Sequence, residues 1–103
     1  MIQSVVYFVE DGDFIKIGRC RKHNYDSGQN LSELQRGNPR ELKYLGILNC
    51  KSEGAAYAQE QLLHERYKHL RHRGEWFCKS QELLDYITDV SEVRSQQSTQ
   101  VPD

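Results

Sequence analysis

The N-terminal part of the chain contains two short runs that are typical of paired β-strands. Residues 4–9 (SVVYFV) are mostly β-branched or aromatic, and residues 13–18 (DFIKIG) alternate between polar and apolar side chains. The break between them contains Asp11 and Gly12, and an Asp-Gly pair favours the tight turn of a β-hairpin. The sequence therefore predicts an antiparallel hairpin at the start of the fold.

The next segments predict a loop, a helix and a third strand. Residues 19–28 are polar and lack periodicity, which indicates a loop. A short helix is expected over residues 29–36, because Gly37 can end it and a proline two residues later prevents its continuation. Residues 42–50 predict a strand, in which Gly46 marks a bulge or a close approach of another backbone.

The second half of the chain predicts two helices. Ser52 is a plausible N-cap for a long helix that reaches about residue 70, and Ser80 can cap a final helix over residues 81–90. Apolar side chains of the long helix fall on one stripe that should face the sheet. These side chains are Ala56, Leu63, Tyr67 and Leu70.

Together these elements define an α+β fold with one domain over residues 1–90. We expect a three-stranded antiparallel sheet with flanking helices, in the order β-β-α-β-α-α. A chain of 103 residues cannot supply two independent cores. Residues 91–103 contain no aromatic side chain and little that could be buried, so a disordered C-terminal tail is expected.

Composition bears on location and redox chemistry. No run approaches the roughly 18 apolar residues of a membrane span, and no basic segment precedes an apolar signal region. A cytoplasmic protein is therefore expected, in the host cytoplasm if the source is viral. Cys20, Cys50 and Cys78 are an odd number at wide spacing, which predicts reduced thiols rather than disulfides. They also lack the spacing of zinc ligands.

The net charge of −1 conceals an uneven distribution of charge along the chain. Residues 14–73 contain 12 Lys/Arg and 6 Asp/Glu, a net charge of +6, whereas the two flanks together carry −7. A basic face that binds nucleic acid is compatible with this distribution, and so is an ordinary solvated surface of mixed charge.

Two pairs of side chains could carry chemistry. Glu60 and His64 are four residues apart in the predicted long helix, so they project from the same side at the border of the apolar stripe. A carboxylate there could hold Mg²⁺ or Mn²⁺ together with water and phosphate oxygens, although a solvated Glu/His pair has the same spacing. Tyr7 and Lys16 lie on adjacent strands of the hairpin, where both could reach a phosphate or could serve packing and edge charge.

Motifs on these elements resemble those of the GIY-YIG nuclease superfamily. Residues 5–7 (VVY) stand where that family has GIY, and residues 16–18 (KIG) stand where it has YIG, in the form seen in a viral and bacterial branch. The branch also shows a segment ending in Gly-Asn-Pro before Glu-Leu, then Glu-x-x-x-His in a helix, then Gly-Glu-Trp-Phe. The corresponding residues here are 34–42, Glu60 with His64, and 74–77. The similarity runs from about residue 4 to residue 77.

The resemblance implies metal-dependent hydrolysis of a DNA phosphodiester. In that family the tyrosine at the position of Tyr7 helps to activate the nucleophile, and the glutamate at the position of Glu60 binds the metal ion. An arginine of the first helix contacts the reacting phosphate. A metal ion lowers the pKa of bound water, and an arginine stabilises charge that grows in the transition state. Lys16, in place of the second tyrosine, would contact phosphate or relay a proton.

The sequence departs from this family at the arginine. Asn30 occupies the position that the branch usually gives to it, and asparagine cannot supply the charge. Arg19, Arg21 or Arg36 could substitute for it in space. The candidate site residues are therefore Tyr7, Lys16, Arg19, Arg21 and His64 for catalysis, Glu60 for the metal, and Lys22, Arg36, Arg40 and Arg71 for contacts to the nucleic acid.

Three functions stay open on the sequence alone. The predicted one is a DNA endonuclease, in which a homodimer could cut both strands. The alternative is a domain that has lost catalysis and binds nucleic acid or a protein partner through the same surface. A third, a small regulator of another protein, fits the size but has no positive motif.

Overall fold

The N-terminal hairpin forms as predicted. The computed structural model describes residues 2–91 of the chain, beginning with β1 (Ser4–Asp11) and β2 (Phe14–Arg21). Gly12 in the turn has a φ of 59°, the left-handed conformation that an Asp-Gly turn uses. The register places Tyr7 opposite Gly18. Because side chains alternate along a strand, Tyr7 and Lys16 lie on the same face of the sheet, as expected.

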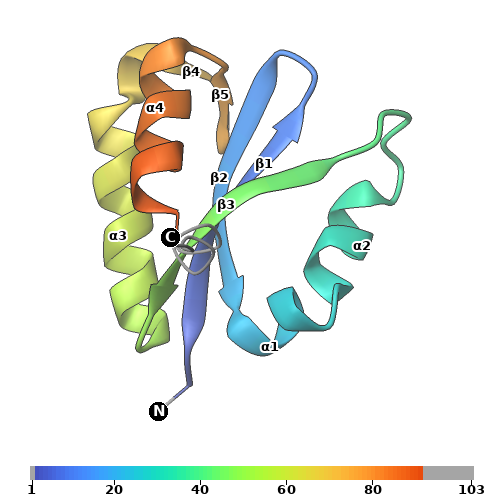
Figure 1. The fold of residues 1–103 in the computed structure, drawn as a ribbon, viewed down its shortest axis with the longest axis vertical. Helices are drawn as coiled ribbons and strands as arrows, with labels where there is room; N and C mark the ends of the chain where they lie inside the picture. Colours follow the sequence, from blue (N-terminus) through green and yellow to red (C-terminus); the bar gives the residue numbers. More distant parts are fainter. Residues whose placement is uncertain (1, 92–103) are drawn as a thin grey trace, which may run out of the picture.

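The prediction of a three-stranded sheet is wrong. The sheet has five strands in the order β3-β1-β2-β5-β4, and all neighbours are antiparallel (Figure 1). The third strand of the prediction is β3 (Lys43–Cys50), which pairs with β1 at one edge. The two strands that were missed are β4 (Arg71–Arg73) and β5 (Trp76–Cys78). Each has three residues, which is too short to show an alternating pattern.

The helical segments also differ from the predicted order. Over the described residues the order is β1-β2-α1-α2-β3-α3-η1-β4-β5-α4. The segment predicted as a loop completes β2 and then forms α1 (Lys22–Asp26), a five-residue helix with no buried residue and thus no apolar periodicity. The next helix, α2 (Gln29–Gln35), matches its prediction to within one residue.

The two longer helices begin where the sequence predicts. In α3 (Glu53–Arg66), the Ser52 Oγ accepts a hydrogen bond from the Ala55 N–H at 3.0 Å, and Ser80 caps α4 (Gln81–Val90) in the same way. The helix predicted to reach residue 70 ends earlier, and its last turn is the separate 3-10 helix η1 (Lys68–Leu70), which leads into β4.

The sheet lies between two helical layers, with α3 and α4 on one face and α1 and α2 on the other (Figure 1). Leu63 and Tyr67 of the predicted stripe are 2% and 1% exposed and pack with Phe8 and Ile17 of the hairpin. Tyr7 belongs to the opposite core, beneath α1 and α2. The hairpin therefore supplies the centre of both cores.

Gly46 marks both a bulge and a close approach. β3 has an extra residue here, because Phe8 faces Gly46 whereas Val9 faces Tyr44. A Cβ on Gly46 would clash with the side chain of Ser91 at the end of α4. Ser91, the first residue of the predicted tail, is itself buried, and residues 92–103 of that tail lie outside the described residues.

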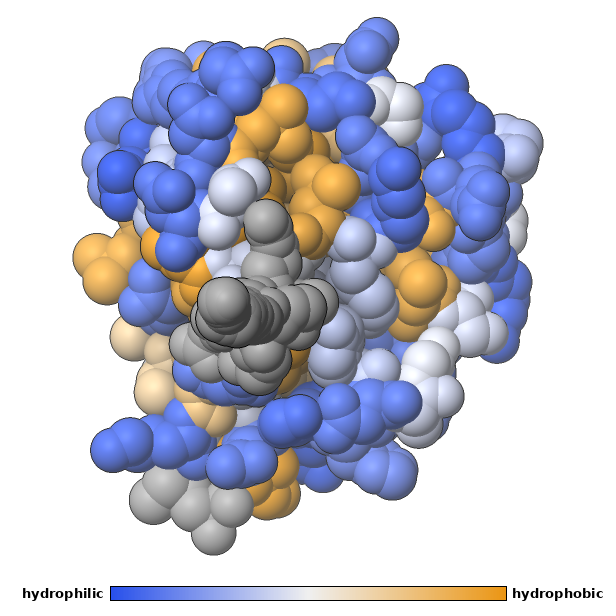
Figure 2. Space-filling model, viewed as in Figure 1, coloured by the Kyte–Doolittle hydropathy of each residue, from blue (hydrophilic) through white to orange (hydrophobic). Residues whose placement is uncertain are grey.

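The distribution of hydrophobic and hydrophilic side chains on the surface agrees with the arrangement of helical layers on both faces of the sheet. In the space-filling view, hydrophilic side chains cover most of the periphery, and hydrophobic ones gather mainly toward the middle, between the helical layers (Figure 2). Within residues 2–91, no helix combines the length and the apolar character that a membrane span requires. Among the described residues, Cys20, Cys50 and Cys78 form no disulfide.

Candidate functional site

Glu60 is a buried carboxylate on the sheet-facing side of α3, with 3% of its surface exposed. Its Oε1 accepts a hydrogen bond from the Arg19 Nε at 3.1 Å. Burial raises the pKa of the Glu60 carboxyl and the negative charge of Glu75 adds to the rise, whereas His64 and Arg19 oppose it. The charge of Glu60 is thus incompletely compensated, and an additional cation beside it would be stabilised.

Arg19 reaches Glu60 from the adjacent strand. In the alternation of β2, Arg19 lies on the same face as Ile17, which is the face covered by α3. Its side chain is 42% exposed, and its guanidinium carbon lies 5.1 Å from the centre of the Tyr57 ring on α3. Of the three arginines considered as replacements at the Asn30 position, Arg19 is the one that contacts Glu60.

His64 lies one turn beyond Glu60 on α3 and is tied to β2. Its Nε2 is 2.9 Å from the carbonyl oxygen of Ile17, and its ring centre lies 5.1 Å from that of Phe77. A carbonyl oxygen can only accept, so Nε2 carries the proton in this contact. In the neutral ring, Nδ1 is consequently the nitrogen that can accept a proton.

Tyr7 lies on the other face of the sheet, directly across from a glycine. The position of a Cβ on Gly18 would be 2.5 Å from the Tyr7 hydroxyl oxygen, so the tyrosine ring occupies the space that any larger residue would need. Tyr7 is 4% exposed. Burial raises its pKa well above the usual value, Glu75 adds to the rise and a hydrogen bond from Asn30 opposes it. Tyr7 is therefore a neutral phenol at physiological pH.

Glu75 acts on residues of both faces of the sheet. Its Oε1 accepts from the Lys16 Nζ at 2.9 Å, and its backbone carbonyl accepts from the Ile17 N–H at 2.9 Å. Its charge raises the pKa of both Tyr7 and Glu60. Glu75 is not among the predicted site residues, although it is part of the Gly-Glu-Trp-Phe motif, which was the available signal.

Apart from Tyr7, which lies on the other face of the sheet, these side chains gather at an edge of β2. Strand β5 pairs with β2 only over Phe14–Lys16, and within the described residues no strand pairs with β2 beyond that point on this side. An open cleft of about 430 Å³ lies beside this edge and is lined by His64, Lys68, Arg71 and Glu75 among others. The edge is therefore accessible from a polar and partly basic hollow.

Arg21, a predicted replacement for the arginine, and Lys22, a predicted nucleic-acid contact, form ion pairs elsewhere. Arg21 pairs with Glu53 at the N-terminus of α3, and both line a second hollow of about 210 Å³ together with Arg19. Lys22 pairs with Asp26 within α1. Arg21 is the last residue of β2 and Lys22 the first of α1, and each pairs with a carboxylate other than Glu60.

The remaining predicted contacts are dispersed. Arg36 is exposed at the end of α2, and Arg71 is exposed on β4, where its Nε donates to the carbonyl of Gly74 at 2.7 Å. Asn30 donates to the Tyr44 hydroxyl at 2.8 Å on the face of the sheet that holds Tyr7. The structure thus brings Arg71 to the cleft beside His64, and it keeps Arg36 apart from that cleft.

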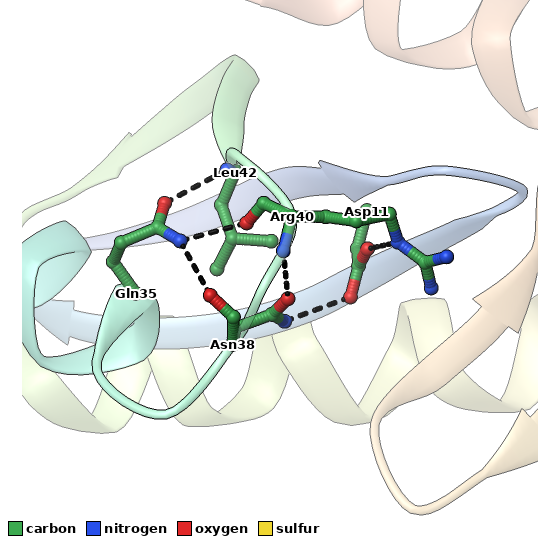
Figure 3. A network of polar contacts seen from close by, with 5 residues as sticks. All are labelled: Asp11, Gln35, Asn38, Arg40 and Leu42. Carbon is green, nitrogen blue, oxygen red and sulfur yellow. Dashed lines mark hydrogen bonds and ion pairs between the residues drawn. The ribbon is translucent and has the colours of Figure 1, made fainter.

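The Gly-Asn-Pro segment holds a loop to the hairpin (Figure 3). The Asn38 amide donates to Asp11 at 2.9 Å, its Oδ1 accepts from the Arg40 N–H, and the Arg40 Nε donates to Asp11 at 2.6 Å. Gln35 donates to the carbonyls of Asn38 and Arg40 and accepts from the Leu42 N–H. Arg40, predicted to contact nucleic acid, therefore holds together the turn end of β1 and the loop after α2.

A metal ion would rely on few protein ligands here. Among residues 2–91, no group of three or more His, Cys, Asp or Glu side chains is placed to hold a metal ion. Mg²⁺ is often held by one or two carboxylates, with water and phosphate oxygens completing its shell. The buried carboxylate of Glu60, with the charge of Glu75 acting on it, fits this chemistry.

The fold and the site together define a small α+β domain with a five-stranded antiparallel sheet and a buried, arginine-paired carboxylate near a strand edge. The family model of the T5orf172 domain matches residues 4–96. The chain therefore belongs to the T5orf172 domain family, which is a nuclease-like family. No curated protein and no solved structure matches the chain.

Proposed function

We propose that this protein is a metal-dependent endonuclease of the GIY-YIG type that hydrolyses phosphodiester bonds of DNA. The observation that carries the proposal is the buried Glu60 carboxylate, which pairs with Arg19 and is influenced by Glu75 at the edge of β2. Membership of a nuclease-like family supports the same reaction class. The KIG form of the second motif suggests the viral and bacterial branch.

Glu60 would hold Mg²⁺ or Mn²⁺ in this proposal. When bound, the ion would neutralise charge on the phosphoryl oxygens and lower the pKa of a bound water. Glu75 is the second carboxylate of the site, and its ion pair with Lys16 keeps an ammonium beside it. Lys16 would then serve as a contact to a phosphate oxygen as well as a partner of Glu75.

Arg19 would take the role of the arginine that the family has at the position of Asn30. Its side chain is 42% exposed, and so it can turn from the Glu60 carboxylate toward a bound phosphate. Guanidinium donors stabilise the negative charge that grows on phosphoryl oxygens during hydrolysis. Asn30 instead donates to Tyr44 and supports the packing around Tyr7.

His64 would accept the proton of the attacking water, and Tyr7, from the other face of the sheet, would contact a phosphate oxygen. As a neutral phenol, Tyr7 can orient a phosphate oxygen by a hydrogen bond but is a poor base. His64 has Nδ1 available as an acceptor, because its Nε2–H donates a hydrogen bond to the Ile17 carbonyl oxygen. We therefore assign the water's proton to His64 and the phosphate contact to Tyr7. The phosphorus gains one oxygen from water while its bond to the leaving oxygen breaks, and the leaving oxygen keeps the electron pair of that bond and takes a proton from a second water.

The test is incubation of the purified protein with single-stranded, duplex and branched DNAs in Mg²⁺ or Mn²⁺, with EDTA as the matched control. We expect cleavage of at least one substrate that depends on the added ion. Asn30 at the family's arginine position is the observation that favours the alternative, a domain that binds without cutting. Stable DNA binding with no cleavage across all substrates and both ions would support that alternative.

A further inference from the structure

Tyr57 is an exposed aromatic side chain beside the site and has no evident role in packing. It is 51% exposed, and the other large hydrophobic side chains exposed within residues 2–91 are Ile2 and Leu62. Tyr57 precedes Glu60 by three residues, so the two project from neighbouring positions on α3. An exposed tyrosine adds little to helix formation, because aromatic residues are only moderate helix formers.

The Tyr57 ring is already part of a stacked arrangement. The guanidinium of Arg19 lies over it, with the guanidinium carbon 5.1 Å from the ring centre, and the same guanidinium pairs with Glu60. A planar cation on an aromatic ring leaves flat surfaces on which another planar group can stack. This surface adjoins the residues to which we assign phosphate chemistry.

The stripe that begins at Tyr57 continues into the cleft. Gln61 and His64 follow at i+4 and i+7, on the same side of α3, and both line the cleft that also contains Lys68 and Arg71. From Tyr57 to His64 the helix rises about 10 Å. This side of α3 therefore has an aromatic plane at one end and, at the other, a cleft of mixed charge in which Glu65 and Glu75 accompany the two basic side chains. Aromatic planes and basic side chains are the groups that bind single-stranded nucleic acid.

We propose that the Tyr57 ring becomes a stacking site for the base of an unpaired nucleotide next to the scissile phosphate when Arg19 turns toward that phosphate. A base within a duplex is stacked on both faces by its neighbours and cannot reach such a plane unless it leaves the helix. The substrate is therefore DNA with an unpaired base at the cleavage position, in a single strand or at a branch. This inference rests on the proposed function, since it takes DNA as the ligand.

The test measures stacking directly, without catalysis. Metal-free protein in EDTA is titrated into a single-stranded oligonucleotide that contains 2-aminopurine, whose fluorescence falls when the base stacks. Wild-type protein and Tyr57→Phe should quench the probe with similar affinity. Tyr57→Ala should bind about 5- to 150-fold more weakly and lose the quenching, the range reported for removal of one stacking aromatic. Leu62→Ala, an exposed apolar change on another side of the same helix, is the matched control and should behave like wild type.

Several outcomes would overturn the stacking site. One is quenching by Tyr57→Ala that equals quenching by the wild-type protein. Another is a loss of quenching in Tyr57→Phe as large as that in Tyr57→Ala. The third is the absence of quenching by the wild-type protein. Cleavage assays with added metal ion separate this inference from the proposed function. Cleavage with unaltered quenching in Tyr57→Ala would reject stacking and retain the nuclease. Quenching that depends on Tyr57 in a protein that never cuts would retain stacking and reject the nuclease.

Discussion

The Arg19 Nε lies 3.1 Å from the Glu60 Oε1, and this contact joins residues 41 positions apart. It places a permanent positive charge against a buried carboxylate at the point where β2 and α3 meet. The guanidinium that the family resemblance expects from the first helix can thus come from β2 instead.

Replacement of Arg19 should reduce cleavage more than it reduces DNA binding. Arg19→Ala is expected to slow single-turnover cleavage by about 10²- to 10³-fold, the usual effect of losing one charge-stabilising donor. Arg19→Lys keeps the charge but loses the planar fork, so it should recover only part of the rate. The check is single-turnover kinetics beside a binding titration. Equal cleavage rates in Arg19→Ala and wild type would show that Arg19 does not stabilise the reacting phosphate.

Gly18→Ala should disturb Tyr7. The added Cβ would lie 2.5 Å from the Tyr7 hydroxyl oxygen, and the buried ring has little room to move. Overpacking of this kind costs about 1–3 kcal/mol of unfolding free energy. Urea unfolding should reveal this loss. The double variant with Gly18→Ala and Tyr7→Ala should lose less unfolding free energy than the sum of the losses in the two single variants. Strict additivity would mean that the two residues do not compete for space.

Asn38→Ala should destabilise the fold in a pH-dependent way. Asn38 and then Arg40 hold the pKa of Asp11 below its usual 3.8. A lowered carboxyl pKa stabilises the protein above the unfolded-state pKa, and this stabilisation is lost as pH falls through the folded-state value. We expect Asn38→Ala to lose about 1.5–3 kcal/mol at pH 7, as for a hydrogen bond to a charged group.

Urea unfolding from pH 7 down to pH 2 checks this prediction. The stability difference between wild type and Asn38→Ala should shrink below about pH 4, where Asp11 becomes protonated in the unfolded chain. A difference that stays constant over the whole range would show that the Asp11 charge does not contribute.

Leu63→Ala and Leu62→Ala form a matched pair on α3. Leu63 is 2% exposed in the core and Leu62 is 64% exposed. Truncation of the buried leucine should cost about 2–5 kcal/mol of unfolding free energy. The exposed one should change stability by no more than about 0.5 kcal/mol. Comparable losses in the two variants would contradict the packing of α3 on the sheet.

The sequence predicted the elements whose signals are local. An Asp-Gly turn between β-rich runs was sufficient for the hairpin, and Ser52 and Ser80 were sufficient for the starts of α3 and α4. Strands β4 and β5 have three residues each, and they are held by the pairing of β5 with β2 and of β4 with β5, so no local pattern indicated them.

The candidate site was only partly predictable for the same reason. Glu60 and His64 share one helix, and their spacing was visible in the sequence. Arg19 lay in a segment expected to be a loop, so its contact with Glu60 depended on an extension of β2 that polar residues did not indicate. Glu75 acts on both Tyr7 and Glu60 only because β5 returns to the edge of β2.

The most direct test of the account is the metal-dependent cleavage rate of Glu60→Gln against wild type, with Glu82→Gln on α4 as an exposed control. The amide keeps the shape of the side chain but loses the charge that would hold the cation. Because burial disfavours that charge, the melting temperature of Glu60→Gln should equal or exceed that of wild type. We predict that Glu60→Gln binds DNA at least as tightly as wild type and does not cut it, while Glu82→Gln cuts normally. Cleavage by folded Glu60→Gln at the wild-type rate would contradict the account.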